Sequence, residues 1–369
     1  MSNKKVCSFN STKSWGGGEK WHFDIAKRLK KSDFVPFVIT NKQSELYKRA
    51  KISGLDTISI KITNLSFLNV FKVLRIAKIF KRNRVHYLII NHPADLKIAG
   101  LAAKIAGLKN IIYRRGSAIP IKNSFLNRFY FSKIVTHIIA NSEETKRTIN
   151  ANNPNLFPAE KISVIYNGLD LQKFDYQEYA PIYRKKENEI VLGNSGRLVP
   201  QKSQKDLIEL AKKLKAKKIK FKILIVGKGN LLTELKNFAK QSDVENEIEF
   251  LGFIENTKAF YESIDIFLLS SLWEGFGYVI AEAMAAKKAV IAYNISSNPE
   301  LIVNNKTGFL IEKQDIDAFV EKIEWFVSNP QQLKLFGDQA RKRVEDLFVI
   351  DKTFDNLIKF LIQLANTNS

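Results

Sequence analysis

The chain has 369 residues, too many for one ordinary domain, and 45% of them are hydrophobic and 26% charged. That composition is typical of a soluble globular protein of two or three domains and excludes a disordered or fibrous chain. A single cysteine, Cys7, excludes a disulfide framework and a cysteine-based zinc cluster. The four histidines contain no H-x-x-x-H pair, which argues against a histidine-rich metal site.

The net charge of +22 is concentrated in the first half of the chain. Residues 1–180 contain 31 Lys and Arg against 12 Asp and Glu, a net charge of +19, whereas residues 181–369 contain 28 against 25. We therefore expect two domains with different partners. The basic half should face an anionic partner. The candidates are nucleic acid, phospholipid headgroups and a phosphorylated acceptor.

No run of about 18 uncharged apolar residues occurs, so we expect no membrane-spanning helix. The basic start of the chain is followed by an apolar run that ends at Phe9, which is too short for the core of a signal peptide. We expect the chain to remain in the cytoplasm.

The first half of the chain alternates between apolar runs typical of strands and segments of helical periodicity. The expected strands are 5–9, 34–40, 56–62, 87–91, 110–113, 137–141 and 162–166. The expected helices are 20–31, 67–80, 96–106, 125–133 and 143–150. Ser142 is the expected N-cap of the last of these helices.

A polar, charged stretch at 172–189 is the best candidate for a linker, and the alternation restarts after it. The expected strands are 190–195, 220–226, 248–250, 266–269, 289–292 and 308–311. The expected helices are 203–217, 231–241, 257–263, 277–286, 316–328, 331–347 and 352–365. Alternating strands and helices predict an α/β fold with two doubly wound parallel sheets in tandem, each expected to bind ligands at the carboxyl ends of its strands.

The segment Glu274-Gly-Phe-Gly-Tyr-Val-Ile-Ala-Glu282 follows a predicted strand and opens a predicted helix. Its two glycines let backbone N–H groups at the start of the helix approach an anion. Glu274 precedes the helix and Glu282 lies within it, so the two carboxylates could hold opposite ends of one ligand. The alternative is an amphipathic surface helix with both glutamates solvated.

A second segment, Gly193-Asn-Ser-Gly196-Arg197-Leu-Val-Pro200-Gln-Lys202, runs from a predicted strand into a glycine turn. Arg197 offers a bidentate fork to phosphate oxygens, and Lys202 offers a mobile point charge. The alternative is a solvated basic loop, which is common in a chain so rich in lysine.

The first strand-to-helix loop contains Gly16, Gly17 and Gly18 followed by Glu19. Three glycines allow a ligand to approach the backbone, but the spacing is not G-x-G-x-x-G, and Gly227-Lys-Gly229 lacks a third glycine. Neither loop supports a nicotinamide or flavin site. No G-x-x-x-x-G-K-[ST] motif occurs, which argues against a P-loop nucleotidase.

In this order and spacing, the motifs resemble those of glycosyltransferase family 4, the retaining GT-B enzymes with a "glycosyl transferases group 1" domain. The motifs that carry the resemblance are Glu274-x7-Glu282, Gly196-Arg197…Lys202, Asn167-Gly168-Leu169-Asp170, Asp265…Ser270-Ser271…Glu274, the glycine loop at 16–18 and His137-Ile-Ile-Ala-Asn141-Ser142. The resemblance covers nearly the whole chain and implies two Rossmann-like domains facing a central cleft. The expected domains are a basic acceptor-side domain at 1–175, a nucleotide-sugar donor domain at 187–350, and a helix at 351–369 packing back on the first.

The resemblance also implies roles for individual residues. Arg197 and Lys202 would hold the diphosphate of the donor and stabilise the charge of the leaving group, which makes both catalytic candidates. Glu274 would contact hydroxyls of the transferred sugar, and Glu282 would bind the ribose. The other donor-binding candidates are Gly16, Gly17, Gly196, Phe253, Ile254, Gly275, Phe276, Gly277 and Tyr278. No clustered Asp-x-Asp occurs, so we expect neither a metal ion nor a cofactor.

One segment departs from the family pattern. Many relatives have a histidine after the strand that ends here at Tyr113, whereas this chain has Arg114 and Arg115. Arg115 could bind a donor or acceptor phosphate, with Arg114 on the same side, but an arginine cannot act as a base at neutral pH. His92 is the remaining catalytic candidate, although a lone histidine is more often structural.

Two basic helical segments, 67–80 with its tail and 123–134, interleave apolar and cationic residues. They could lie on an anionic membrane or be ordinary sheet-covering helices with a solvated face. The leading hypothesis is a bacterial retaining glycosyltransferase of lipopolysaccharide or related polysaccharide synthesis, with a lipid-linked or phosphorylated acceptor at the inner membrane face. One alternative is a nucleotide-sugar epimerase or phosphorylase, and another is a nucleic-acid-binding module. Under the leading hypothesis we expect that the protein does not bind nucleic acid.

Overall fold

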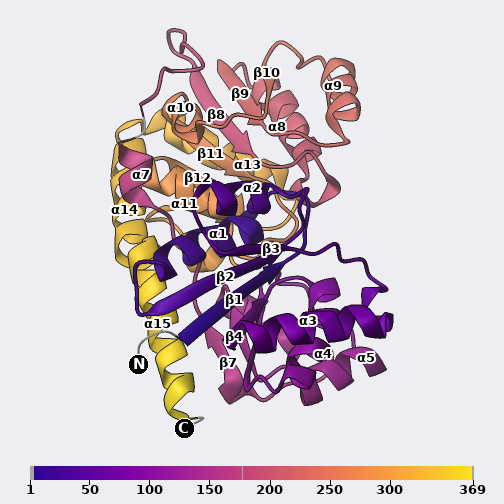
Figure 1. Cartoon of the computed structure of the whole chain (residues 1–369). Coiled ribbons are helices and arrows are strands. Elements are labelled where there is room, and N and C mark those ends of the chain that lie inside the picture. Colours follow the sequence, from indigo (N-terminus) through magenta and orange to yellow (C-terminus); the bar gives the residue numbers. More distant parts are fainter. Residues whose placement is uncertain (1–3, 177, 368–369) are drawn as a thin grey trace. The chain divides into compact units, whose positions relative to one another are not determined.

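The computed structural model describes residues 4–176 and 178–367. It separates into two compact units, which Figure 1 shows in sequence colours. Unit 1 comprises Met1–Asn167 and Phe354–Ser369, and unit 2 comprises Gly168–Thr353.

Unit 1 is built on a parallel sheet of seven strands in the order β3-β2-β1-β4-β5-β6-β7. The strands are β1 (Lys4–Asn10), β2 (Phe34–Thr40), β3 (Thr57–Ser59), β4 (Val85–Ile90), β5 (Asn110–Arg115), β6 (His137–Ala140) and β7 (Ile162–Val164). The chain winds outward from β1 to β3 and then returns to the other side of β1 to form β4. The carboxyl ends of β1 and β4 therefore flank the point where the winding reverses, and this is where such sheets bind ligands.

The helices of unit 1 cover both faces of this sheet. They are α1 (Gly17–Leu29), α2 (Glu45–Ile52), α3 (Val70–Arg82), α4 (Pro93–Ala106), α5 (Phe125–Phe129), α6 (Glu143–Ile149) and most of α15 (Ile350–Thr367), with short helical turns η1 (Ser66–Leu68), η2 (Tyr130–Ile134) and η3 (Ala159–Lys161).

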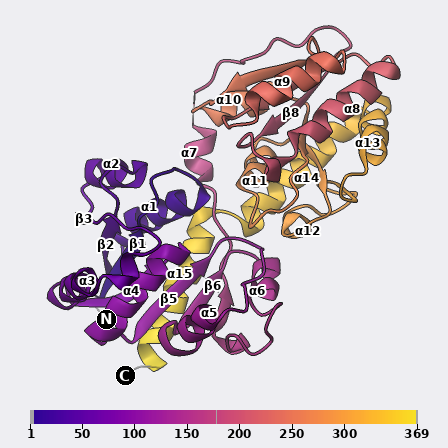
Figure 2. The ribbon, with the colours of Figure 1, turned by 90° about the vertical axis from the view of Figure 1, so that its right-hand side faces the viewer.

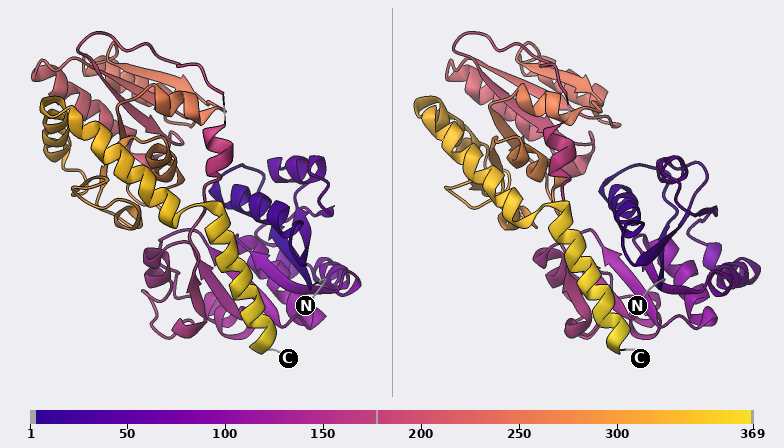
Figure 3. Two further views of the ribbon diagram at one scale, coloured as in Figure 1. Left: turned by 90° about the vertical axis from the view of Figure 1, so that its left-hand side faces the viewer. Right: turned by 60° about the vertical axis from the view of Figure 1, so that its left-hand side comes forward.

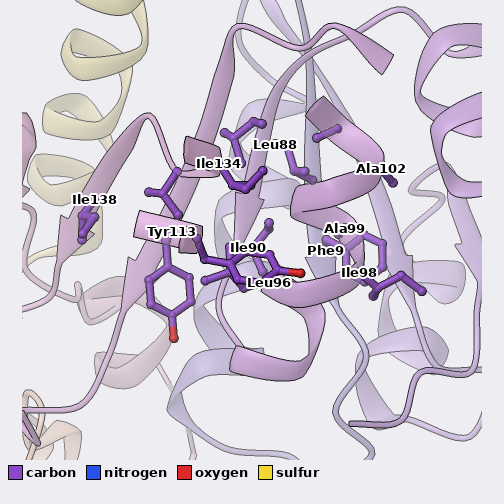
Figure 4. Packing of buried hydrophobic residues seen from close by; sticks show 14 of the residues in the cluster. Phe9, Leu88, Ile90, Leu96, Ile98, Ala99, Ala102, Tyr113, Ile134 and Ile138 are labelled. Atoms are coloured by element: carbon purple, nitrogen blue, oxygen red, sulfur yellow. The ribbon is translucent and has the colours of Figure 1, made fainter. Parts of the chain in front are cut away.

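Alternate residues of the strands of unit 1 point to opposite faces of the sheet, as the pleat requires. Phe9, Leu88 and Tyr113 pack with α3, α4 and η2 on one face, and Figure 4 shows part of this cluster. Tyr87 and Ile89 pack with α1 and α15 on the other face. Both faces are therefore closed mainly by apolar packing.

The last helix is held on unit 1 by polar and aromatic contacts as well as by burial. The hydroxyl of Tyr87 donates to the carbonyl of Leu361 at 3.0 Å, and the ring of His137 lies 6.1 Å from that of Phe360. Figure 3 shows this yellow helix beside the strands of unit 1. Residues at the end of the chain thus complete the core of the first unit.

Unit 2 is built on a parallel sheet of six strands in the order β10-β9-β8-β11-β12-β13. The strands are β8 (Ile190–Ser195), β9 (Phe221–Val226), β10 (Ile248–Gly252), β11 (Ile266–Leu269), β12 (Ala289–Tyr293) and β13 (Gly308–Ile311). The winding reverses between β8 and β11, so the loops after these two strands flank the expected ligand position.

The helices of unit 2 are α7 (Leu171–Asp175), α8 (Gln204–Ala216), α9 (Leu232–Gln241), α10 (Thr257–Glu262), α11 (Tyr278–Ala285), α12 (Asn298–Leu301), α13 (Ile316–Ser328) and α14 (Gln331–Leu347), with the turn η4 (Pro200–Lys202). Apolar side chains of α8, α9 and α13 close one face of the sheet, and Figure 2 shows these helices around the strands. On the other face Gly193 leaves room for Phe260 of α10, because a Cβ there would lie 2.8 Å from that ring.

The prediction of an α/β fold with two doubly wound parallel sheets is confirmed. Ser142 caps α6 as expected, because its Oγ accepts the backbone N–H of Thr145 at 3.0 Å. Three helices lie where none was predicted: α2, α12, and α7 at the start of the predicted linker. No helix within the described ranges is both long and apolar enough to cross a bilayer.

Candidate functional site

In unit 2, the loops after β8 and β11 are joined to each other by hydrogen bonds. The backbone N–H of Leu272 donates to the carbonyl of Gln201 at 2.8 Å, and Nε2 of Gln201 donates to the carbonyl of Trp273 at 2.9 Å. Oγ of Ser270 donates to the carbonyl of Lys202 at 2.9 Å. The two loops therefore form one rigid edge at the point where the sheet winding reverses.

The two charged residues that sequence analysis assigns to this edge are in direct contact. Nζ of Lys202 lies 2.5 Å from Oε1 of Glu274, and the side chains are only 12% and 10% exposed. Removal of one partner would leave a largely desolvated charge, which is far costlier than breaking a surface pair. The pair therefore holds both side chains in place at this edge.

Arg197 lies on the same loop but is exposed. Its Nη2 donates to Oε1 of Gln201 at 3.1 Å, and its carbonyl accepts from Nε2 of Gln204 at 3.1 Å. Gln201 thus links the arginine to the loop after β11. Sequence analysis did not single out this glutamine, because nothing in its local pattern distinguishes it from other surface amides.

Gly227 and Gly229 make the close packing of this edge possible. A Cβ at Gly227 would lie 1.8 Å from the carbonyl oxygen of Gly196, and one at Gly229 would lie 2.1 Å from that of Leu198. Gly227 also has a φ of +145°, which side-chain-bearing residues rarely adopt. The glycine pair after β9 therefore lets two backbones touch.

Helix α11 begins directly after Glu274-Gly-Phe-Gly. Gly277, with a φ of +72°, is the N-cap residue and has no side chain to satisfy the first N–H groups of the helix. A helix start of this kind favours an anion, since its N–H groups and its dipole both point toward it. Phe276 instead points into the protein, where its ring lies 5.5 Å from those of Tyr278 and Phe348.

Glu282 is held on α11 by a buried tyrosine. The hydroxyl of Tyr261 donates to Oε2 of Glu282 at 3.2 Å and lies 3.1 Å from the carbonyl oxygen of Val279. Burial first, and then the charge of Glu282, raise the pKa of Tyr261 well above its ordinary value, so the hydroxyl remains a donor. Tyr261 is a second residue of the site that the sequence pattern did not reveal.

Phe253 and Ile254 follow β10 at the same edge. The carbonyl of Gly252 accepts the N–H of Gly227 at 2.7 Å, which ties this segment to the glycine pair. The ring of Phe253 is 65% exposed, with Nζ of Lys228 6.0 Å from its centroid. An exposed flat ring suits stacking against a planar group.

In unit 1, the loop between β1 and α1 is pinned at both ends by buried carboxyl groups. Ser11 donates to Asp95 through its backbone N–H at 2.9 Å and through its Oγ at 2.5 Å. At the other end, Nδ2 of Asn10 donates to Oε1 of Glu19 at 3.0 Å. Gly16, the N-cap residue of α1, lies between these anchors, so the glycines that sequence analysis assigned to the donor are held in a defined loop.

Asp95 is fully buried in the first turn of α4. Burial raises its pKa to about 6, while the hydrogen bonds from Ser11 and the charge of His92 lower it and the charge of Glu19 raises it. His92 itself is exposed at the N-cap of α4 and makes no side-chain capping bond. An acidic residue in the first turn of a helix that follows a strand is a signal that sequence analysis could have used for Asp95.

Arg114 and Arg115 point in opposite directions from the end of β5. Arg114 is 1% exposed, and it donates to Oδ1 of Asn91 at 2.7 Å and to Oδ1 of Asn167 at 2.5 Å, with its guanidinium 4.4 Å from the ring of Trp21. This burial differs from the expectation that Arg114 faces a phosphate. Arg115 is only partly buried, and Nη2 donates to the carbonyl of Ile119 at 2.5 Å.

His22 packs beside Arg114 in the core of unit 1. Burial, together with the charge of Arg114, lowers the pKa of His22 to about 3, so the imidazole is neutral at pH 7. Its two ring nitrogens have no hydrogen-bond partner among the described residues.

Within residues 4–176 and 178–367, no group of three or more His, Cys, Asp or Glu side chains is arranged to hold a metal ion. The sequence-predicted residues of unit 2 lie along one edge of its sheet, with Lys202 and Glu274 in contact. Those of unit 1, namely Gly16, Gly17, His92, Arg114 and Arg115, lie along the corresponding edge of the other sheet.

Comparison with known proteins gives two family models that together span most of the chain. The model described as "Glycosyltransferase Family 4" matches residues 15–173, and the model described as "Glycosyl transferases group 1" matches residues 175–343. These matches cover both units.

Among curated proteins, the chain is 32% identical over 225 residues to the capsular polysaccharide biosynthesis glycosyltransferase CapM of Staphylococcus aureus, a match spanning 58% of each chain. It is 28% identical over 323 residues to the UDP-Gal:alpha-D-GlcNAc-diphosphoundecaprenol alpha-1,3-galactosyltransferase of Escherichia coli, spanning 82% of each chain.

Among solved structures, a glycosyltransferase from Rickettsia africae has a TM-score of 0.88 and 24% identity over 99% of both chains. The Anabaena protein HepE, solved in complex with UDP-glucose, has a TM-score of 0.82 and 20% identity, covering 97% of this chain and 99% of the other. These likenesses confirm the predicted GT-B fold.

Proposed function

Because this chain is a glycosyltransferase of family 4 with the GT-B fold, we propose that it is a retaining enzyme of cell-envelope glycan synthesis, such as that of lipopolysaccharide or a related polysaccharide. It transfers a sugar from a nucleoside-diphosphate donor to a lipid-linked glycan acceptor. The observation that carries the proposal is the nearly buried pair of Lys202 and Glu274 at the start of α11.

The donor is assigned to the edge of unit 2. Lys202, Arg197 and the first N–H groups of α11 bind the diphosphate, while Glu274 turns from its lysine to hydroxyls of the sugar. Glu282, oriented by Tyr261, binds the ribose, and Phe253 with Ile254 borders the base. The Anabaena relative solved with UDP-glucose supports a sugar nucleotide as donor.

In the proposed reaction, no side chain of the protein forms a covalent bond to the sugar. The bond between the anomeric carbon and the diphosphate oxygen breaks, and the acceptor oxygen bonds to the same carbon on the same face. The acceptor hydroxyl gives its proton to the departing diphosphate. Lys202, Arg197 and the helix N–H groups stabilise the charge that develops on this leaving group, so the step proceeds with neither a metal ion nor a cofactor.

The acceptor is assigned to unit 1. The E. coli relative is named for an acceptor in which a sugar is linked to undecaprenol through a diphosphate, which supports a lipid-linked acceptor here. The glycine loop at Gly16 and Gly17 borders the reacting sugar, His92 lies at its edge, and Arg115 provides positive charge for phosphate.

An anionic membrane surface at the inner face of the cytoplasmic membrane is the proposed location of this acceptor. Around the start of α3, large apolar side chains are exposed beside cationic ones. The apolar residues are Leu65, Leu68, Val70, Phe71 and Leu74, and the cations are Lys61, Arg75 and Lys78. Such a surface binds anionic lipid by insertion of apolar groups and by charge attraction.

A transfer assay tests the proposal. The full-length protein is incubated with radiolabelled sugar nucleotides of different bases and with an undecaprenyl-diphosphate-linked sugar, and label is measured in the lipid extract. We expect label in the lipid from one donor, with the anomeric configuration of the donor kept in the product by NMR.

Three other outcomes would contradict the proposal. Conversion of the donor sugar without acceptor would indicate an epimerase, and turnover only with free phosphate would indicate a phosphorylase. Salt-dependent binding of nucleic acid without binding of any sugar nucleotide would indicate a nucleic-acid-binding module.

A further inference from the structure

A small pocket opens in unit 1 between the N-terminal half of α4 and the segment that leads from β5 to η2. It has a volume of about 200 Å³. Pockets that enclose a drug-sized molecule measure roughly 300–1,000 Å³, so this one suits a headgroup rather than a whole sugar nucleotide. It is separate from the residues assigned to the donor, all of which except Gly16 and Gly17 lie in unit 2.

Three cations line the pocket, and they come from three different segments of the chain. They are Lys97 of α4, Arg115 at the end of β5, and Lys122 of the following loop. No acidic side chain lines the pocket, and none of the three cations forms an ion pair among the described residues. The lining of the pocket therefore carries a net positive charge, which favours an anion with more than one negative charge.

Arg115 is oriented for this role by its surroundings. Its bond to the carbonyl of Ile119 fixes the guanidinium against the loop, and the buried ring of Tyr113 lies beside it in the pocket wall. Burial raises the pKa of Tyr113, an effect that the charge of Arg115 opposes. The hydroxyl of Tyr113 thus remains a hydrogen-bond donor beside a fixed cation, a combination that suits phosphate oxygens.

Exposed apolar side chains flank the pocket on both sides. On one side, Ile119 belongs to the loop that contributes Lys122, and Phe125 begins the short helix α5 that contributes Asn127; 47% and 78% of their surfaces are exposed. On the other side, Nζ of Lys97 lies 5.4 Å from the ring of Phe67, directly before the exposed residues at the start of α3. In Figure 1 the helices α3, α4 and α5 lie together on one side of unit 1.

We propose that this pocket binds the diphosphate of an isoprenoid-linked acceptor, with its hydrocarbon chain leaving over the flanking apolar side chains. The cations supply charge for two phosphates, the pocket has room for little more than them, and the surrounding surface is apolar where a lipid chain must emerge. The inference rests on the proposed function, because it assigns the acceptor of that reaction to named residues. It places the acceptor phosphates on Arg115, Lys97 and Lys122.

Binding of geranyl diphosphate to the full-length protein, followed by calorimetry, tests the assignment. Inorganic pyrophosphate and geraniol serve as probes for the phosphates alone and the chain alone. We expect Arg115→Gln and Lys122→Gln each to weaken binding of geranyl diphosphate about tenfold, the loss of one charge-assisted contact. The matched control Lys104→Gln, an exposed lysine on α4 outside the pocket, should bind like the wild type.

Geranyl diphosphate should also bind more tightly than pyrophosphate, and geraniol should not bind measurably. Equal binding of geranyl diphosphate and pyrophosphate would overturn the lipid assignment in favour of a free phosphate compound. Weakening by Lys202→Met but not by Arg115→Gln or Lys122→Gln would place the probe at the donor edge and overturn the site.

The assignment can be separated from the proposed function on the same samples. If Arg115→Gln weakens geranyl diphosphate binding while no sugar reaches a lipid acceptor, the proposed function fails and the anion site stands. If sugar transfer occurs and its KM for the acceptor is the same in Arg115→Gln and wild type, the proposed function stands and the site assignment fails.

Discussion

The strands of the two sheets follow the same kind of order. At the carboxyl edges of these sheets, however, the charged side chains have different partners. In unit 2, the nearly buried cation Lys202 contacts the carboxylate of Glu274. In unit 1, the buried cation Arg114 donates to the amide oxygens of Asn91 and Asn167, and the buried carboxyl of Asp95 accepts from a serine. The first arrangement joins two opposite charges, whereas these hydrogen bonds of unit 1 each join an ionisable group to a neutral one.

This difference bears on whether a ligand could replace the partners of each charged side chain. Under the proposed function, a phosphate of the donor takes Lys202 while a sugar hydroxyl takes Glu274, so each charge keeps a partner when the ligand binds. Arg114 is enclosed, and any ligand that drew it out would leave the buried amide of Asn167 without this donor. Burial alone therefore does not identify a ligand site; the chemistry of the partner does.

The largest expected effect is on the charge pair of unit 2. Lys202→Met removes a cation from the leaving group and leaves Glu274 with a desolvated charge, so we expect the transfer rate to fall about 100- to 1,000-fold. Lys205→Met is the matched control, since Nζ of Lys205 lies over the ring of Phe238 away from the edge. A rate for Lys202→Met similar to that of the control would contradict the role of the pair.

The next largest effect is a loss of stability when the glycines that allow close backbone packing in unit 2 are replaced. Gly227→Ala combines an unfavourable φ with a Cβ 1.8 Å from a carbonyl oxygen, whereas Gly252→Ala meets nothing within 4 Å and only the strain of its φ of +70° remains. We expect losses in the free energy of unfolding of about 3 kcal/mol or more for the first and about 1 kcal/mol for the second. Equal losses in urea titration would show that close packing is not the cause.

A smaller effect should appear in the pH dependence of unit 1. The pKa of Asp95 in the folded protein is about 6, above the ordinary value of 3.8, so the folded state binds its proton more tightly than the unfolded state. The contribution of Asp95 to stability is therefore greatest below pH 4 and falls as the pH rises to about 6.

We expect the difference in unfolding free energy between wild type and Asp95→Asn to be about 2 kcal/mol more favourable to wild type at pH 4 than at pH 7. The comparison of two proteins removes the titration of all other groups. A difference independent of pH would mean that Asp95 is ionised in the folded protein throughout this range.

The smallest expected effect is on membrane binding by the exposed apolar surface at the start of α3. Leu74→Ser should weaken binding to vesicles of anionic phospholipid about fivefold, because roughly 1 kcal/mol of apolar contact is lost. Leu335→Ser is the matched control, since both leucines are 48% exposed and Leu335 lies on α14 of unit 2. Equal weakening by both variants in a flotation assay would exclude the proposed surface.

The strands were predictable from the sequence because those buried on both faces form continuous apolar runs, and the ranges predicted at 190–195 and 266–269 coincide with β8 and β11. Helices α2, α7 and α12 were missed because they are short. The first two begin at side-chain caps, with Ser44 accepting the N–H of Tyr47 and Asp170 that of Lys173. The apolar alternation at 56–62 gave only the short strand β3.

The site was predictable only where a motif names its residues. Lys202 and Glu274 are 72 positions apart, and the family motifs name both, but their contact is a property of the tertiary structure. Tyr261 and Gln201 could not be found, because their roles depend on which side chain faces them. Arg114 and Arg115 are identical in type and adjacent on a strand, so they must point to opposite sides, and only the packing decides which is enclosed.

The central claim is that the edge of unit 2 binds the donor diphosphate through Lys202. Calorimetric titration of UDP, GDP and ADP into wild type, Lys202→Met and Arg115→Gln tests it most directly. We expect one nucleoside diphosphate to bind the wild type, to bind Lys202→Met at least tenfold more weakly, and to bind Arg115→Gln unchanged. Binding of none of the three, or equal weakening in both variants, would contradict the account.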